Sequence, residues 1–227
     1  MASNELVFLL QITCVASGSI FMLRLGSAAL TSYIALLGVL SNLLVCQEIS
    51  LFGLTVTASD SLAVGLILSL NLMQEWFGRA AVRRAIYINF SALLAYLALT
   101  QIHLLYSPAP SSASTHIAYQ TLLNTMPRLA LASLSSYFLV QVADAQVYRA
   151  LKLQLSSNWF TARSILSLLA SELLDTVLFS MLGLYGVVAD IGNILFFSYA
   201  VKLVTIACFI PFIMLVKKIV PHENQDL

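Results

Sequence analysis

Apolar residues fill seven long stretches of the chain, and short polar segments separate them. A helix needs about 20 mostly apolar residues to cross a bilayer, and each stretch approaches that length, although the third is short. Their boundaries are roughly 5–23, 27–46, 61–77, 85–106, 122–148, 163–186 and 194–216. The pattern predicts an all-α, polytopic membrane protein with seven transmembrane helices.

Two of the connecting segments have patterns of their own. Within residues 47–60, Phe52, Leu54 and Val56 alternate with glycine or threonine, which fits a short strand, a re-entrant loop or an outer hairpin. Residues 107–116 are rich in proline and serine, which is typical of a turn outside the membrane.

The composition supports the membrane assignment and excludes other classes. The chain has 227 residues, of which 60% are hydrophobic and only 9% are charged, and its mean hydropathy is +0.92. A soluble domain has roughly 45–50% apolar and about 25% charged residues, so this chain lacks the polar surface that a soluble globule needs. The net charge of +1 is spread along the chain and forms no footprint for nucleic acid. The lipid bilayer is therefore its expected environment.

Lysine and arginine occur in alternate connecting segments. Residues 47–60, 107–120 and 187–193 contain neither, whereas every other connection contains at least one. Positive residues mark the cytoplasmic side of a membrane protein, so we expect the N-terminus outside and the C-terminus in the cytoplasm. The cytoplasmic residues would be Arg24, Arg79, Arg83, Arg84, Arg149, Lys152, Arg163, Lys217 and Lys218.

The sequence shows no motif of an enzyme or a metalloprotein. The three cysteines have neither metal nor redox spacing. Metalloprotease, phosphate-loop, hydrolase and dinucleotide-binding signatures are missing from the sequence. We therefore expect no catalytic residues, no metal and no cofactor.

Ionisable residues nevertheless fall inside the predicted spans. Each costs about 2.5–3.5 kcal/mol on insertion scales and is a functional candidate by default. In the stretch 163–186, Asp175 lies about 18 Å from Arg163 along a helix, near the bilayer centre, and Lys202 reaches a similar depth from the other side. We expect Lys202 to pair with Asp175 or Glu172. The full set is Glu75, Arg128, Asp144, Glu172, Asp175 and Lys202.

Helical spacing places these residues on polar stripes. At 100° per residue, one stripe of the sixth predicted helix holds serines and Asp175, with Glu172 beside it. A stripe of the fifth holds Tyr137, Gln141 and Asp144, and a stripe of the third holds Glu75. A structural alternative remains, in which Glu75 and Asp144 pair with basic residues at the inner helix ends and Arg128 reaches outward to the interface. The basic partners would be Arg79, Arg83 or Arg149.

Polar stripes of this kind favour a transporter. A secondary transporter binds its solute at mid-membrane between polar helix faces. A channel usually lines its path with repeated rings, and a membrane enzyme would need a nucleophile with a base, for which no histidine is suitably placed. Neutral donors and acceptors beside charges suit a flat, hydrogen-bonding solute.

Several segments resemble the queuosine precursor transporters, in collinear order from about residue 27 to 218. They are NLLV (42–45), NLMQEWFGRAAVRR (71–84), PRLALASLSSYFLVQVADAQVY (127–148), RSILSLLASELLDTVLF (163–179) and SYAVKLVTIACFIP (198–211). The resemblance implies a bacterial inner-membrane importer that salvages 7-deazaguanine bases for tRNA modification. It also implies one domain over 1–227, with a six-helix core and an additional N-terminal helix.

The resemblance implies a set of solute-binding residues. Glu172 departs from the family pattern, which has an amide there, and leaves the preferred base open. Chemistry suggests that Asp175 accepts the N1–H and amine of the base. The flat face of the base can lie on Tyr137, Tyr199 or Phe179. Glu172 would either carry a proton during transport or hold the ammonium group of an amine-bearing base. The implied residues are Asn42, Glu75, Arg128, Gln141, Asp144, Asp175, Thr176 and Lys202.

The sequence leaves open an alternative function and the oligomeric state. The alternative function is a small-molecule-binding membrane subunit of an energy-coupled, vitamin-type uptake complex. The oligomeric state is also open, and a homodimer is one alternative.

Overall fold

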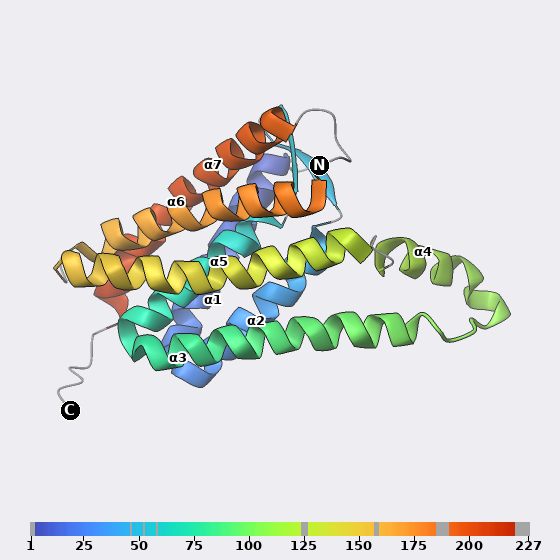
Figure 1. The fold of residues 1–227 in the computed structure, drawn as a ribbon, viewed down its shortest axis with the longest axis horizontal. Helices are drawn as coiled ribbons and strands as arrows, with labels where there is room; N and C mark the ends of the chain where they lie inside the picture. The colour runs from blue at the N-terminus through green and yellow to red at the C-terminus, as the bar shows by residue number, and fades with distance from the viewer. Residues whose placement is uncertain are drawn as a thin grey trace.

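A computed structural model describes residues 3–45, 47–51, 53–57, 59–123, 127–156, 159–184 and 191–220. It is a helical bundle with one small β-hairpin (Figure 1). The helices are α1 (Asn4–Arg24), α2 (Ser27–Leu44), α3 (Asp60–His103), α4 (Ala113–Leu123), α5 (Pro127–Gln154), α6 (Phe160–Phe179) and α7 (Ile191–Ile219). Short helical turns lie at η1 (Pro110–Ser112) and η3 (Ser180–Leu184), and the strands are β1 (Glu48–Leu51) and β2 (Leu54–Thr57).

Among the described residues, five helices are long and apolar enough to cross a membrane. They are α1, α2, α3, α6 with its continuation into η3, and the part of α7 from Leu195 to Val216. This supports a polytopic membrane protein. The helix α5 is also long, with 28 residues, but a polar stripe lowers its hydropathy.

Two of the predicted spans, 61–77 and 85–106, belong to one helical element, α3. It has 44 residues, about 66 Å at 1.5 Å per residue, which is twice the roughly 30 Å of a bilayer core. Gly78, with φ 77° and ψ −179°, interrupts the helix, and the chain turns back there (Figure 1). We call residues 60–77 the first limb of α3 and residues 79–103 its second limb.

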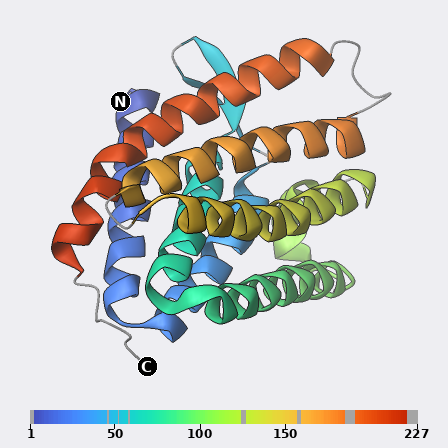
Figure 2. The same cartoon turned by 60° about the vertical axis from the view of Figure 1, so that its left-hand side comes forward.

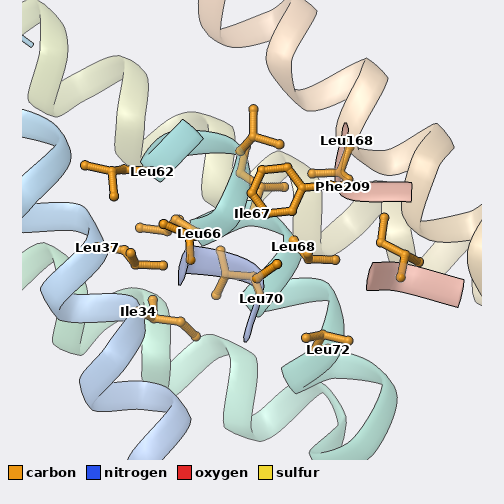
Figure 3. Close-up of a cluster of buried hydrophobic side chains, with 14 of the residues drawn as sticks. Ile34, Leu37, Leu62, Leu66, Ile67, Leu68, Leu70, Leu72, Leu168 and Phe209 are labelled. Carbon is orange, nitrogen blue, oxygen red and sulfur yellow. The ribbon is translucent and has the colours of Figure 1, made fainter. Parts of the chain in front are cut away.

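The first limb of α3 is the central helix of the bundle. Nearly every side chain from Ser61 to Glu75 is buried, as expected for a helix that is covered on all sides. Its apolar residues contact α2 through Ile34 and Leu37, α6 through Leu168 and α7 through Phe209 (Figure 3). This contact surface is the apolar core of the molecule.

The remaining helices form a series beside this core. The order α7, α6, α5 and second limb of α3 is visible in two views (Figures 1 and 2). Helix α1 packs against α2, α3 and α7. Its ends are attached by Asn4, which donates to the Ser50 carbonyl at 2.9 Å, and by Arg24, which donates to the Ile219 carbonyl at 2.8 Å.

Two segments between the spans have regular structure. Of the three alternatives for residues 47–60, the structure contains an antiparallel hairpin in which Glu48 pairs with Thr57 and Leu51 with Leu54. Gly53, with φ 80°, lies in its turn. Residues 107–116, expected to form a turn, lead through η1 into the exposed helix α4.

We expect Gly78→Ala to lower the stability of the protein. The backbone conformation of Gly78 is accessible essentially to glycine alone and costs other residues about 1–3 kcal/mol, and no atom lies close enough for a new methyl group to contact. The melting temperature of the detergent-solubilised protein should fall by roughly 2–4 °C per kcal/mol. The exposed neighbour Arg79→Ala is the control and should change stability by less than about 0.5 kcal/mol. An unchanged melting temperature for Gly78→Ala would mean that the turn accommodates a side chain.

Candidate functional site

Buried polar side chains form four groups that follow one another along α5. Tyr148, Asp144, Gln141 and Tyr137 lie at steps of four, three and four residues, so they share one face of that helix. We number the groups from the end of the bundle at which α3 turns. Level 1 surrounds Glu75, level 2 Asp144, level 3 Asn89 and level 4 Lys202.

Level 1 is a network around the Glu75 carboxylate. Its Oε1 lies 2.6 Å from Nη2 of Arg163, and its Oε2 lies 3.3 Å from Nζ of Lys152. The Tyr148 hydroxyl donates to Oε2 at 3.1 Å. Arg163 also donates to the Leu155 carbonyl at 3.1 Å, just beyond α5. The network therefore joins α3, α5 and α6.

The side chain of Arg163 points into the bundle. Arg163 was expected on the cytoplasmic side of the membrane, and its side chain is 2% exposed. In the structural alternative for Glu75, its carboxylate pairs with a basic residue near the helix ends. The structure contains such ion pairs, with Arg163 and Lys152.

Level 2 contains a carboxylate without a cation among the described residues. The Oδ1 atom of Asp144 accepts hydrogen bonds from Ser167 at 2.5 Å and from Ser171 at 2.8 Å. Its Oδ2 atom is buried and has no hydrogen-bond partner in the described part of the chain. The residue is 1% exposed, so its carboxyl group is buried between α5 and α6.

Level 3 is built from neutral groups. Asn89, on the second limb of α3, is fully buried. Its Nδ2 donates to the Tyr137 hydroxyl and to Oε1 of Gln141, each at 3.1 Å. The Oδ1 of Asn89 and the Nε2 of Gln141 are buried, and neither has a partner among the described residues. Level 3 therefore has an unused acceptor and an unused donor.

The close approach of α2 to level 3 depends on Gly38. A Cβ atom at this position would collide with the Asn89 side chain and the Tyr137 hydroxyl. One turn further along α2, Asn42 donates to the Gly38 carbonyl at 3.2 Å. Asn42 is thus on the helix that covers level 3.

Level 4 is an ion cluster between α6 and α7. The Lys202 Nζ lies 2.9 Å from Oε2 of Glu172 and 2.5 Å from Oδ2 of Asp175. The pairing that the sequence analysis expected, between Lys202 and one of the two acids, thus occurs with both. The Asp60 carboxylate, at the start of α3, also acts electrostatically on Lys202.

The two acids of level 4 differ in accessibility. The Asp175 side chain is 27% exposed, whereas that of Glu172 is fully buried. With all three groups ionised, two carboxylates face one ammonium group and leave one negative charge in excess. Asp60 adds a further negative charge. Level 4 therefore favours a ligand that brings a positive charge or hydrogen-bond donors.

Two residues of the predicted site, Asp144 and Thr176, have hydrogen-bond partners of their own. Asp144 accepts from Ser167 and Ser171, and among the described residues no ion pair joins it to Lys202. The Thr176 hydroxyl donates at 2.7 Å to the Glu172 carbonyl of its own helix. Arg128 lies in the first turn of α5, and its side chain is outside the part that the structure describes.

Asn89 belongs to the polar interior but was not among the predicted residues. An asparagine within the apolar stretch 85–106 was the available signal. A neutral amide carries no insertion penalty comparable to that of a charge, so a search for ionisable residues passes over it.

Comparisons with known proteins agree with this architecture. The model of the family described as "Putative vitamin uptake transporter" matches residues 57–216, which contain all four levels. A protein of Bacillus subtilis (strain 168) named "Probable queuosine precursor transporter" is 30% identical over 212 residues, which cover 91% of each chain. No solved structure is significantly similar to the chain. The chain thus belongs to the family described as putative vitamin uptake transporters, whose members are multi-pass membrane transport proteins and not enzymes.

Proposed function

We propose that the chain imports queuosine precursors, that is 7-deazaguanine bases or queuine, across the bacterial inner membrane for salvage into tRNA. The observation that carries the proposal is level 4, where Lys202 faces two carboxylates within the bundle. Excess negative charge inside the bundle favours a solute that has hydrogen-bond donors or a cationic group. The name of the Bacillus subtilis relative supports the class of solute.

The chemistry of the base matches the accessible acid. A 7-deazaguanine presents N1–H and an exocyclic amine side by side, and one carboxylate can accept both. Asp175 is the natural acceptor because its side chain is partly exposed. We assign the base edge to Asp175 and the ammonium group of amine-bearing bases to Glu172, which Lys202 partly neutralises.

Neighbouring groups of level 3 would complete the site. Gln141 has a buried Nε2 without a partner among the described residues, and this donor suits the carbonyl oxygen of the base. The ring of Tyr137 offers a stacking surface for a flat solute. The proposed solute site thus consists of Asp175, Glu172, Lys202, Gln141 and Tyr137, a smaller set than the sequence predicted.

The family description favours one alternative function. A vitamin-type uptake subunit would bind its solute in the same place but would need an energy-coupling partner. Purified chain in proteoliposomes distinguishes the two, since an importer takes up labelled base alone and a binding subunit does not. Uptake by the purified chain therefore distinguishes the two functions, whereas solute binding alone does not.

We also propose that the whole chain, 1–227, is a single membrane domain of seven spans. The two limbs of α3 would each cross once, and α5 would cross with its polar stripe turned inward. Seven crossings put the two termini on opposite sides of the membrane, which agrees with an N-terminus outside and a C-terminus in the cytoplasm.

A topology test follows from this arrangement. A reporter fused at residue 112, in η1, should report the outer side, and a reporter at the C-terminus should report the cytoplasm. The physical reason is the alternation of basic residues between connections. Paired alkaline phosphatase and fluorescent protein fusions provide the measurement. Both reporters on the same side would contradict the proposal.

Asp175→Asn should abolish uptake of every base. The change keeps the size of the side chain but removes the charge that accepts two charge-assisted hydrogen bonds, each worth about 1.5–3 kcal/mol, so uptake should fall by roughly a hundredfold or more. Initial rates with labelled base in proteoliposomes give the measurement. Glu5→Gln, on α1, is the matched acid-to-amide control and should transport normally. Normal uptake by Asp175→Asn would remove this residue from the site.

Glu172→Gln should change the ranking of solutes and not transport itself. If Glu172 holds an ammonium group, the wild type should prefer amine-bearing bases over the neutral nitrile-bearing base by about tenfold or more. The variant should lose that preference and still import the neutral base. Competition between the two bases gives the measurement. An unchanged ranking would mean that Glu172 is only a structural partner of Lys202.

A further inference from the structure

We propose that Asp144 binds one proton from the outer solution and releases it to the cytoplasm in each transport cycle, so that import is coupled to proton entry. This inference rests on the proposed function, because it needs a transported solute. Asp144 itself stays outside the proposed solute site.

The Asp144 carboxyl group is buried in a way that disfavours a permanent charge. It is 1% exposed, and the two hydroxyl groups that contact it, from Ser167 and Ser171, both donate to Oδ1. Oδ2 has no partner among the described residues. An isolated ionised carboxylate in such a place is far more costly to bury than a neutral carboxyl group. A proton on Oδ2 removes this cost and leaves both serine hydrogen bonds intact.

The neighbouring charges do not neutralise Asp144, since each of them is already paired. On one side, Arg163 and Lys152 contact Glu75. On the other side, Lys202 contacts Glu172 and Asp175. The titratable and charged groups nearest level 2 along each adjoining helix are Glu75 from α3, Tyr148 from α5, Arg163 and Glu172 from α6, and Lys202 from α7.

A proton suits this position better than a metal cation or the solute. Hard metal cations take about six or more oxygen ligands, whereas Oδ2 has no hydrogen-bond partner among the described residues, and these residues form no cluster of three or more potential metal ligands. The proposed solute site already has Asp175 as the acceptor for the base, and the Oδ1 atom of Asp144 is occupied by two serine hydroxyl groups. A proton needs no shell of ligands, and it leaves both serine hydrogen bonds of Asp144 intact.

Level 3, two of whose residues belong to the proposed solute site, follows Asp144 along α5. Gln141 is one turn from Asp144 on α5, and it accepts a hydrogen bond from Asn89, which also donates to Tyr137. A solute that displaces these contacts would therefore act on the helix that carries Asp144. Proton binding and solute binding therefore both involve helix α5.

The test measures proton movement and solute accumulation in the same proteoliposomes. The purified wild type is reconstituted with a trapped pH-sensitive dye, and the probe is the labelled neutral nitrile-bearing 7-deazaguanine. Addition of this base should acidify the lumen, because one proton enters with each molecule of base. The neutral base itself brings no proton. An inward gradient of one pH unit should concentrate the base about tenfold, since one unit is a tenfold difference in proton concentration.

The variant Asp144→Asn should separate transport from its driving force. The asparagine Oδ1 can still accept from both serines, and the amide resembles the protonated carboxyl group. The variant should exchange labelled for unlabelled base at equal pH as the wild type does, but the tenfold accumulation should vanish and the lumen should not acidify. Ser136→Ala, another buried polar change on α5, is the control and should retain both.

Other outcomes overturn the inference. They are accumulation by Asp144→Asn equal to that of the wild type, loss of exchange in a folded Asp144→Asn, or wild-type uptake without acidification or only with sodium. The wild-type dye measurement decides the question even if the variant does not fold. If the wild type takes up none of the bases, the proposed function fails as well, which is a different result from uptake without proton movement.

Discussion

A charged side chain inside an apolar bundle needs an opposite charge or several donors, and this requirement aligns the helices of the chain. Glu75 joins α3 to α6 through Arg163, and Lys202 joins α7 to two acids of α6. Removing one member of a buried pair costs about 3–5 kcal/mol. A shift of α6 by one turn would break both sets of contacts, so its register against α3 and α7 is determined by charge.

The other half of the bundle is organised differently. Around the first limb of α3, the contacts are apolar, and Ile34, Leu66 and Phe209 are fully buried there. Where polar groups occur in this half they are small, as in the hydrogen bond of 2.9 Å between Ser19 and Ser69. Small hydroxyl residues let membrane helices approach closely. One half thus depends on close packing and the other on paired charges.

Much of this arrangement was predictable from the sequence, and the exceptions have physical causes. Hydropathy located the centres of the helices, and helical spacing placed Glu172, Asp175 and Lys202 at one depth. Sequence spacing gives the side of the membrane on which an arginine lies but not whether its side chain turns into the bundle, so it did not indicate the contact of Arg163 with Glu75. The serine partners of Asp144 likewise depend on how α5 and α6 face each other, which spacing along one helix does not give.

The turn at Gly78 has a consequence for motion within the bundle. The two limbs of α3 both hold α5, since Gln74 donates to the Ala145 carbonyl and Asn89 donates to Gln141, each at 3.1 Å. A rearrangement that keeps these two bonds moves α3 and α5 as one rigid body. Asp144 meets its serines between α5 and α6, and Arg163 of α6 reaches Glu75 of α3. A movement of α6 along α5 therefore has to break the serine hydrogen bonds of Asp144 and the ion pair of Arg163.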